Sequence, residues 1–310
     1  MFDWLNNFFG WLIRFFCELC GNNFVVGIFV FTLVVNAVLI PLNIKQQKST
    51  ASQARMKNKL AKLQEKYKND KAKYQEEMGK LYSEAGSSPL SGCLLMFIRF
   101  PIFICIYTAV REALSYVYGA DAKLIEAAEK VLKSDVLGKN LLSSSTPQLS
   151  ILEHMDKLVE HDGKFAALTG GLNLDFNLLG INLLETPSLG KVFTLISIIP
   201  LLSFLTSFAS SLISMANTKK TNGDSNAATN GCMMIMMPLF SLWITFSVPG
   251  AVGWYWVCSN IVSTIIMTAM QKIYFPGKLI AEAEAKEAKK RRKLEQQRIN
   301  PTLNEKSILK

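Results

Sequence analysis

Two polar side chains lie inside apolar stretches of this sequence and are its first candidates for chemistry. Asn36 lies in FTLVVNAVLIPLNIKQ, residues 31–46, and Arg99 lies in FIRFPIF, residues 97–103. A charged Arg near the middle of a bilayer costs about 2.5–3.5 kcal/mol, and such a residue normally faces a cavity or a partner. The apolar runs contain no Asp or Glu, so Arg99 has no counter-ion within them and needs water or a bound partner to solvate it.

These two residues are predicted to lie at the same depth. Nine residues separate Asn36 from Lys45, and nine separate Leu90 from Arg99. At about 1.5 Å per helical residue, both are about 13.5 Å from the basic ends of their helices. We therefore expect them to share one site, with Asn36 hydrogen-bonded to Arg99 or to water. The alternative is that Arg99 extends toward lipid phosphates and leaves the site neutral, although its side chain spans only about 6 Å.

Other residues that carry chemistry lack the partners they would need. Cys17 and Cys20 have C-x-x-C spacing, but no second pair and no neighbouring His completes a metal site. His154 and His161 stand alone, and no G-x-x-x-x-G-K-[ST] loop is present. We expect no catalytic residue, no metal and no cofactor, and hence no enzyme.

Hydrophobic runs long enough to cross a bilayer dominate the chain. The 310 residues are 50% hydrophobic with a formal net charge of +10, and a span needs roughly 20 apolar residues. Five runs approach this length, at 24–43, 92–111, 191–214, 232–248 and 250–271. The last two are separated by the short SVPGAVG turn and form a tight hairpin. The sequence therefore predicts an all-α integral membrane protein with five transmembrane helices.

The distribution of charge predicts the orientation of these helices. Segment 44–91 holds eleven Lys or Arg against five acidic residues, and the tail 272–310 holds the same numbers. Segment 112–190 has six Lys against eleven acidic residues. Because cytoplasmic loops are enriched in Lys and Arg, we expect the N-terminus outside, the C-terminus inside and 112–190 on the outer face. No removable signal peptide is evident at the start of the chain.

The segments outside the spans are also predicted to be helical. Residues 1–22 have aromatic residues at helical spacing and predict an interfacial amphipathic helix, followed by a first span over 23–43. Segment 44–91 predicts a cytoplasmic helical hairpin, and residues 92–111 predict the second span. In 112–190, DAKLIEAAEKVLKSD and SILEHMDKLVEHDGKFAAL each predict one amphipathic helix. Residues 191–271 hold spans three to five, and 272–310 form a basic tail.

Four stretches, in order along the chain, resemble the YidC insertases, whose organellar relatives are the Oxa and Alb proteins. They are FTLVVNAVLIPLNIKQQKS, the hairpin MKNKLAKLQEKYKNDKAKYQEEMGKLYSEAG, SPLSGCLLMFIRFPIFICIYTAVREA, and MPLFSLWITFSVPGAVGWYWVCSNIVS with its Tyr-Trp and Ser-Asn pairs. The resemblance covers the chain except for most of 115–175. It implies a membrane protein insertase and chaperone that acts alone or with the Sec translocon.

The resemblance also implies a mechanism and a set of site residues. In this family, a hydrophilic groove among five spans receives a polar segment of the client protein, which lowers the cost of unsatisfied polar groups in the bilayer. The family usually carries an Arg at the position of Asn36 and an uncharged amide at that of Arg99. We therefore expect the charge and the amide to have exchanged helices. The groove residues expected from the resemblance and from polarity are Arg99, Asn36, Trp256, Tyr255, Thr32, Ser259 and Asn260.

Other roles also suit several of these residues. Trp256 and Tyr255 also suit an interfacial anchor, and Ser or Thr residues such as Thr32, Ser203 and Thr206 often bond to their own helix backbone. Basic residues predicted to contact cytoplasmic partners are Lys57, Lys59, Lys62, Lys66, Lys290, Arg291 and Arg292. The partners expected are nascent membrane-protein clients, the Sec translocon, the ribosome, signal recognition particle machinery and anionic lipids. Rival functions are a Sec-associated assembly scaffold and a small anion transporter.

Overall fold

The computed structural model describes residues 3–84, 94–134, 137, 141–143, 145–188, 190, 194–222 and 227–273, with 285, 288, 289, 292, 295 and 296 in the tail. For residues 47–58, 61, 84, 94–99, 217–222, 227–234 and 271, only the backbone is described. The chain divides into two compact units. The first comprises Met1–Ile40, Met96–Ala216 and Asp224–Ile266, and the second comprises Pro41–Leu95, Asn217–Gly223 and Met267–Lys310.

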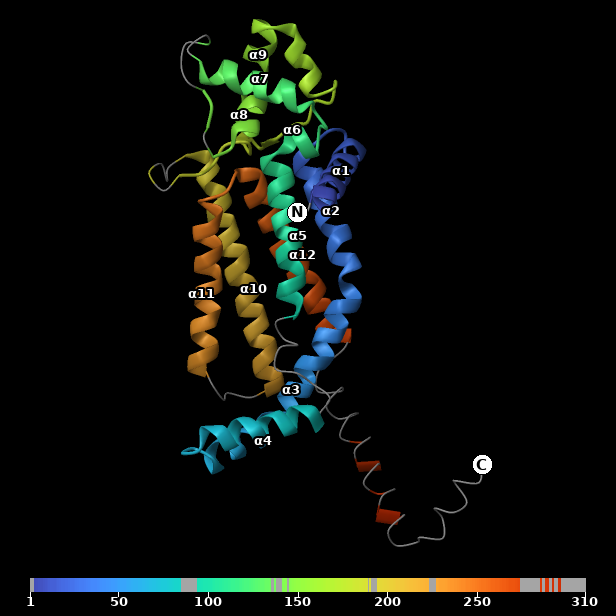
Figure 1. Cartoon of the computed structure of the whole chain (residues 1–310). Helices are drawn as coiled ribbons and strands as arrows, with labels where there is room; N and C mark the ends of the chain where they lie inside the picture. Colours follow the sequence, from blue (N-terminus) through green and yellow to red (C-terminus); the bar gives the residue numbers. More distant parts are fainter. Residues whose placement is uncertain are drawn as a thin grey trace, which may run out of the picture. The chain divides into compact units, whose positions relative to one another are not determined.

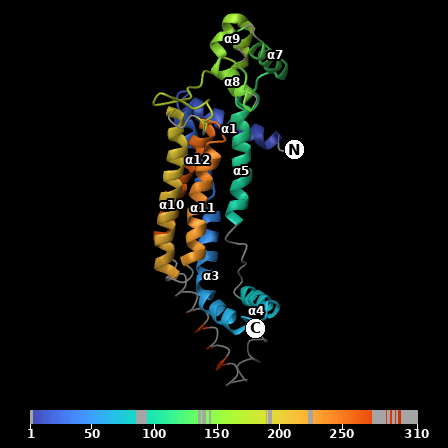
Figure 2. The ribbon, with the colours of Figure 1, turned by 90° about the vertical axis from the view of Figure 1, so that its left-hand side faces the viewer.

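Long apolar helices form the body of the first unit, and the prediction of an all-α membrane protein is confirmed. They are α2 (Phe24–Val38), α5 (Leu94–Arg111), α10 (Ile198–Asn222), α11 (Ala227–Thr245) and α12 (Gly250–Ile273). Figure 1 and Figure 2 show these helices side by side along one direction. Many of their large apolar side chains are exposed, such as Leu205 on α10 and Trp243 on α11. Such exposure suits contact with lipid rather than with water.

The number of helices that qualify as complete spans is smaller than predicted. Among the described residues, Leu195–Ala216 and Gly250–Met270 pass on length and hydropathy, and Phe24–Val38 with Ile40–Gln46 passes if counted as one bent span. Phe100–Arg111 and Ile235–Thr245 are shorter apolar helices. The break at Leu39 has a local cause, because Pro41 has no N–H to continue the helix. A count of five spans stays a prediction.

The first helix, α1 (Asp3–Leu19), packs against α2. Cys17 and Gly27 meet so closely that a Cβ at Gly27 would lie 2.7 Å from the Cys17 Sγ. The opposite face exposes an aromatic row containing Trp4, Phe8 and Trp11. The helix is thus apolar on two sides, which fits the predicted position at a membrane interface.

Segment 112–190 gathers at the end of the helices where α2 and α12 begin (Figure 1). Its elements are α6 (Ala113–Tyr116), α7 (Ala122–Lys133), α8 (Pro147–Glu153), α9 (Met155–His161), the 3-10 helix η3 (Gly163–Leu168), and the strands β1 (Asn177–Leu178) and β2 (Ile181–Asn182). The strands pair antiparallel, with Asn177 opposite Asn182. A second 3-10 helix, η5 (Leu195–Ser197), leads into α10.

The prediction of one continuous helix over SILEHMDKLVEHDGKFAAL is wrong. The chain breaks at His154, whose Nδ1 lies 3.0 Å from the Ser150 carbonyl oxygen, and again at Asp162. The Asp162 side chain accepts a hydrogen bond from the Lys164 backbone N–H and caps η3. Asp162 and Gly163 are a turn-forming pair, so local turn chemistry prevails over the apolar periodicity.

The second unit contains the two helices predicted for segment 44–91. Helix α3 (Ile40–Lys66) is one long helix, and α4 (Lys71–Glu84) follows after a short turn. In that turn, the Asp70 side chain accepts a hydrogen bond from the Lys73 N–H at 3.0 Å. Such a cap starts a new helix where the previous one has ended.

Candidate functional site

Asn36 joins α2 to α12. Its side chain is 4% exposed, and its Oδ1 accepts a hydrogen bond of 3.0 Å from the Ser263 hydroxyl on α12. Its Nδ2 donates to the Thr32 carbonyl oxygen, at 2.9 Å. The amide that interrupts the apolar run is therefore buried and bonded across a helix interface.

Arg99 lies on α5, but its side chain is outside the described residues. The predicted pairing of Arg99 with Asn36 thus stays a prediction. Arg99 precedes Phe103 by four residues, one helical turn, and the Phe103 ring contacts Trp256 on α12 edge-to-face at 4.9 Å.

Three consecutive aromatic residues at the start of α12 hold neighbouring helices. Tyr255 is 8% exposed, with its ring centroid 6.5 Å from that of Phe31 on α2. Trp256 contacts α5, as described above. Trp254, which is not among the predicted groove residues, donates from its indole N–H to the Val25 carbonyl oxygen at 3.0 Å. The row therefore connects α12 to α2 and to α5.

A second set of polar residues connects α10 to α11 and α12. Asn260 donates from Nδ2 to the Thr206 hydroxyl at 3.4 Å, and the hydroxyls of Ser210 and Thr264 are hydrogen-bonded one turn further along. Toward α11, the hydroxyls of Ser203 and Ser241 are 2.6 Å apart. Interhelical hydrogen bonds of this kind contribute about 0.6 kcal/mol on average in membrane proteins. These hydrogen bonds connect α10 to both α11 and α12.

The remaining predicted residues lie in different environments. Thr32 is fully buried, and its hydroxyl donates to the Ile28 carbonyl oxygen at 2.7 Å. This is the bond to its own helix backbone that was the alternative to a groove role. Ser259 is half-buried, with no side-chain hydrogen bond recorded within the described part of the chain. Of the predicted basic contacts, Lys59, Lys62, Lys66 and Arg292 are exposed, whereas Lys57 has no described side chain and Lys290 and Arg291 lie outside the described residues.

A segment that contains the β1–β2 hairpin covers the starting ends of α2 and α12. We call residues 172–185 the strap. Asp175 donates from its backbone N–H to Asn22 O at 2.8 Å and accepts from Phe24 N at 3.0 Å. At α12, Gly250 N donates to Glu185 O and Ala251 N to Leu183 O, both at 2.8 Å. The first N–H groups of a helix have no partner within it, so the strap satisfies these donors in both helices.

Close packing accompanies these hydrogen bonds. The ring centroids of Phe24 and Phe176 lie 4.6 Å apart. A Cβ added to Gly250 would meet the Ile196 Cδ1 at 2.6 Å and the Leu183 Cα and carbonyl oxygen at 3.2 Å. Glycine at position 250 therefore allows α12 to approach the strap.

Cys17, the first cysteine of the C-x-x-C pair, is not placed to react in the described structure. Cys17 is buried, and the pKa of its thiol rises to about 12, chiefly through burial and further through the charges of Cys20 and Glu18. A neutral thiol is a poor nucleophile and a poor metal ligand. Within the part of the chain that the structure describes, no group of three or more His, Cys, Asp or Glu residues is placed to hold a metal ion.

The apolar helices, with polar residues hydrogen-bonded between them, define a multi-pass membrane protein. Comparison with known proteins gives the family. Residues 15–277 match the model of the 60Kd inner membrane protein family, and the chain belongs to that family.

Several similar proteins carry the name membrane protein insertase YidC. The chain is 25% identical over 279 residues to YidC 2 of Listeria innocua, a match that covers 89% of this chain and 73% of that protein. It is 44% identical over 87 residues to YidC of Clostridium perfringens, covering 28% of this chain and 37% of that protein. It is 42% identical over 103 residues to YidC 2 of Bacillus anthracis, covering 32% and 40%. The family expected from the four motifs is confirmed.

Proposed function

We propose that this chain is an insertase and chaperone that moves client membrane proteins into the bilayer and helps them fold. The observation that carries the proposal is the family match over residues 15–277, which includes all the long apolar helices. The names of the similar proteins support the same activity. We place the protein in the bacterial plasma membrane, acting alone or beside the Sec translocon.

The entry site for a polar client segment is proposed to lie between α2, α5 and α12. Asn36 and Ser263 are hydrogen-bonded to each other there. Breaking an interhelical hydrogen bond of this kind costs only about 0.6 kcal/mol on average. A peptide group of the client offers both a donor and an acceptor, so it can replace each partner. When no client is present, Asn36 and Ser263 thus satisfy each other's hydrogen-bonding groups, and a client peptide group can take the place of either.

We propose that Arg99 supplies the positive charge of this groove and that Asn36 takes the amide role. The argument is their equal predicted depth and the lack of acidic residues in the apolar runs. Arg99→Gln is expected to slow insertion, and adding Asn36→Arg is expected to restore it. Wild-type insertion rates in both Arg99→Ala and Asn36→Ala would contradict this assignment.

The strap is proposed to close the outer end of the groove. It caps both α2 and α12 with backbone hydrogen bonds, and segment 112–190 around it carries a net negative charge. The basic segments 44–91 and 272–310 are proposed to face the cytoplasm. Lys59, Lys62, Lys66 and Arg292, which are exposed, would there meet the ribosome, signal recognition particle machinery or anionic lipids.

Reconstitution into liposomes that lack Sec tests the proposed activity. A short single-span client is expected to become protected from added protease at its translocated end, in a protein-dependent manner. Failure of insertion without Sec, with recovery when Sec is added, would favour the assembly scaffold. Flux of anions in the absence of any client would favour the transporter.

A further inference from the structure

The turn between β1 and β2 carries a leucine where both the backbone and water favour another residue. Leu179 and Gly180 connect the strands, and both have a left-handed backbone, with φ of 50° and 89°. Asn, Asp and Gly are usual at both positions of such a turn, because other side chains are crowded against the backbone there. The Leu179 side chain is also 97% exposed, which water disfavours for an apolar group. The requirements of the turn therefore do not explain this residue.

The hairpin adjoins a larger apolar surface. A single exposed leucine is common on a protein surface, but strand β2 packs beside η5, where Leu195 is 64% exposed. From Leu195 the exposed apolar side chains continue along α10 at helical spacing, through Ile198, Leu201 and Leu205. Leu195–Ala216 is one of the segments that qualify as a membrane span. The hairpin therefore lies beside the end of a stripe that faces lipid.

The attachments of the strap set the depth of the hairpin. On one side, Asp175 is hydrogen-bonded to the backbone of Asn22 and Phe24, between α1 and α2. On the other side, the Leu183 carbonyl oxygen accepts a hydrogen bond from the start of α12, where a second candidate span begins. Leu179 is four residues from Asp175 and four from Leu183, so at about 3.3 Å per residue it lies at most about 13 Å from either. The tip of the hairpin is thus within reach of the membrane surface.

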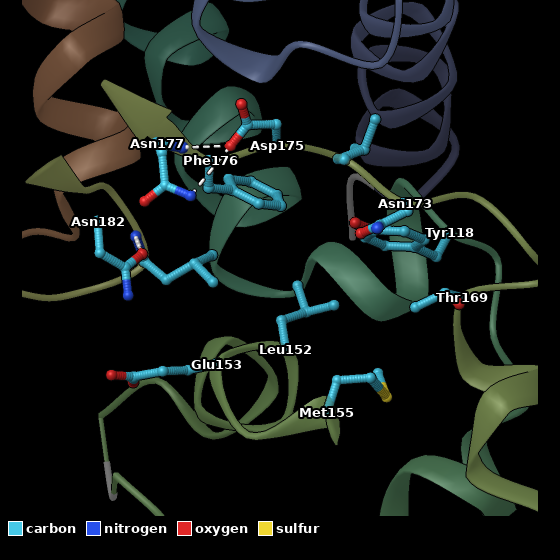
Figure 3. A pocket seen from close by; sticks show the side chains of 12 residues that line it. Tyr118, Leu152, Glu153, Met155, Thr169, Asn173, Asp175, Phe176, Asn177 and Asn182 are labelled. Carbon is cyan, nitrogen blue, oxygen red and sulfur yellow. Dashed lines mark hydrogen bonds between the residues drawn. The ribbon is translucent and has the colours of Figure 1, made fainter. Parts of the chain in front are cut away.

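Polar side chains brace the base of the hairpin. Asp175 accepts hydrogen bonds from the backbone N–H and the side-chain amide of Asn177, at 2.9 and 3.1 Å. The Asn182 Oδ1 accepts one from the backbone N–H two residues further on, at 3.0 Å. All three side chains line a cavity on the strap (Figure 3), and Ile181 is buried in the core. Leu179 is the apolar residue of the hairpin that the protein leaves uncovered.

We propose that the β1–β2 hairpin is a membrane anchor, whose Leu179 side chain enters the lipid interface beside the start of α10. A leucine side chain favours an apolar environment over water by about tenfold or more. Because a single side chain enters, the peptide groups of the turn stay among hydrated headgroups and are not buried unpaired in hydrocarbon. The anchor holds the strap at the bilayer surface whether or not a client is present, so it does not depend on insertase activity.

Photo-crosslinking of the full-length protein in lipid nanodiscs tests this contact. A diazirine analogue of leucine replaces Leu179 with little change in size, and lipid adducts are identified by mass spectrometry. The same analogue at Leu205, on the lipid-facing stripe, is the positive control. At Lys157 it is the aqueous control, because Lys157 is exposed on α9, which lies beyond the ends of the apolar helices (Figures 1 and 2). The adduct yield at position 179 is expected to approach that at 205 and to exceed that at 157 about tenfold or more.

Leu179→Asn separates lipid contact from the geometry of the turn. Asn fits a left-handed backbone better than Leu, so if the turn alone mattered, hydrogen exchange across residues 176–184 would slow. Loss of the lipid contact is expected instead to make exchange in nanodiscs about twofold or more faster.

Three results would overturn the proposal. The first is a lipid adduct yield at position 179 no higher than that at Lys157. The second is crosslinking between two copies of the protein in place of lipid, which would make the hairpin a protein interface. The third is unchanged or slower exchange in Leu179→Asn.

Discussion

Gly250→Ala is expected to release the strap from α12. Position 250 is the first residue of α12, and its backbone N–H donates to Glu185 O. An added Cβ would lie 2.6 Å from the Ile196 Cδ1 and 3.2 Å from the Leu183 Cα and carbonyl oxygen. The Ile196 methyl is the end of a side chain and can turn away, but the Leu183 contact is with backbone and moves only if the strap moves.

The size of the effect follows from the cost of overpacking. Forcing one methyl group into a closely packed contact costs about 1–3 kcal/mol. If the strap relieves the contact by opening locally, its amide hydrogens exchange about fivefold to 150-fold faster than in the wild type. Hydrogen exchange with mass spectrometry, in nanodiscs, measures this for peptides that cover residues 172–186.

Three further variants identify the contact that is responsible. Gly163→Ala, where no atom lies within 4 Å of the new Cβ, is expected to leave exchange unchanged. Gly253→Ala would meet the Ile199 Cγ2 at 2.7 Å, on α10, and is expected to leave the strap closed. Ile196→Val removes the Cδ1 atom that is nearest Gly250, and in the Gly250→Ala background it is expected to recover part of the protection.

The expected pattern is open to refutation. Wild-type exchange across residues 172–186 in Gly250→Ala would show that the strap does not depend on the close approach of α12. Faster exchange in Gly253→Ala, equal to that in Gly250→Ala, would show a general loosening of the α10–α12 contact rather than release of the strap.

Other variants test the site and the first helix. Ser263→Ala leaves the buried Asn36 Oδ1 without its interhelical donor and is expected to cost about 0.6–1.7 kcal/mol, measured as a lower midpoint of thermal unfolding by labelling of buried thiols. Because the pKa of Cys17 is raised from 9.0 to about 12, the unfolded state loses its thiol proton first. The contribution of Cys17 to stability is then constant below pH 9 and falls by about 1.4 kcal/mol per pH unit from there toward pH 12; Cys17→Ala is expected to reduce the slope of alkaline unfolding over this range. Trp11, which is 57% exposed on α1, is expected to be quenched by lipids labelled near the headgroup more than by lipids labelled at the chain end, in a variant where it is the sole Trp.

The helical class and the importance of Asn36 could be predicted from the sequence because both depend on local composition. Long apolar runs leave few alternatives to membrane helices, and a lone amide in such a run needs a partner. The partner itself, Ser263, was not predicted, since a Ser on an apolar helix usually bonds to its own backbone. The available signal was its position three residues after Asn260, because residues three apart are neighbours on a helix surface and Ser263 therefore extends the polar part of α12.

The strap was also missed, although its sequence contains a signal. LNLDFNL, residues 172–178, alternates apolar and polar residues with a period of two, which is typical of an extended segment rather than a helix. The pattern indicates extension but not the partner. The hydrogen bonds to Asn22, Phe24, Gly250 and Ala251 join backbone groups far apart in the chain, and such pairing leaves no trace in side-chain types.

The strap and the polar pair are connected through the register of two helices. Asn36 follows the capped start of α2 at Phe24 by twelve residues, and Ser263 follows the start of α12 at Gly250 by thirteen. Both helices run away from the strap, so their polar residues lie about 18 and 20 Å from it at 1.5 Å per residue. A slip of α12 by one residue would shift Ser263 by about 1.5 Å and turn it by about 100°, away from Asn36. Because the strap caps the first residues of both helices, it helps to set the register in which Ser263 lies opposite Asn36.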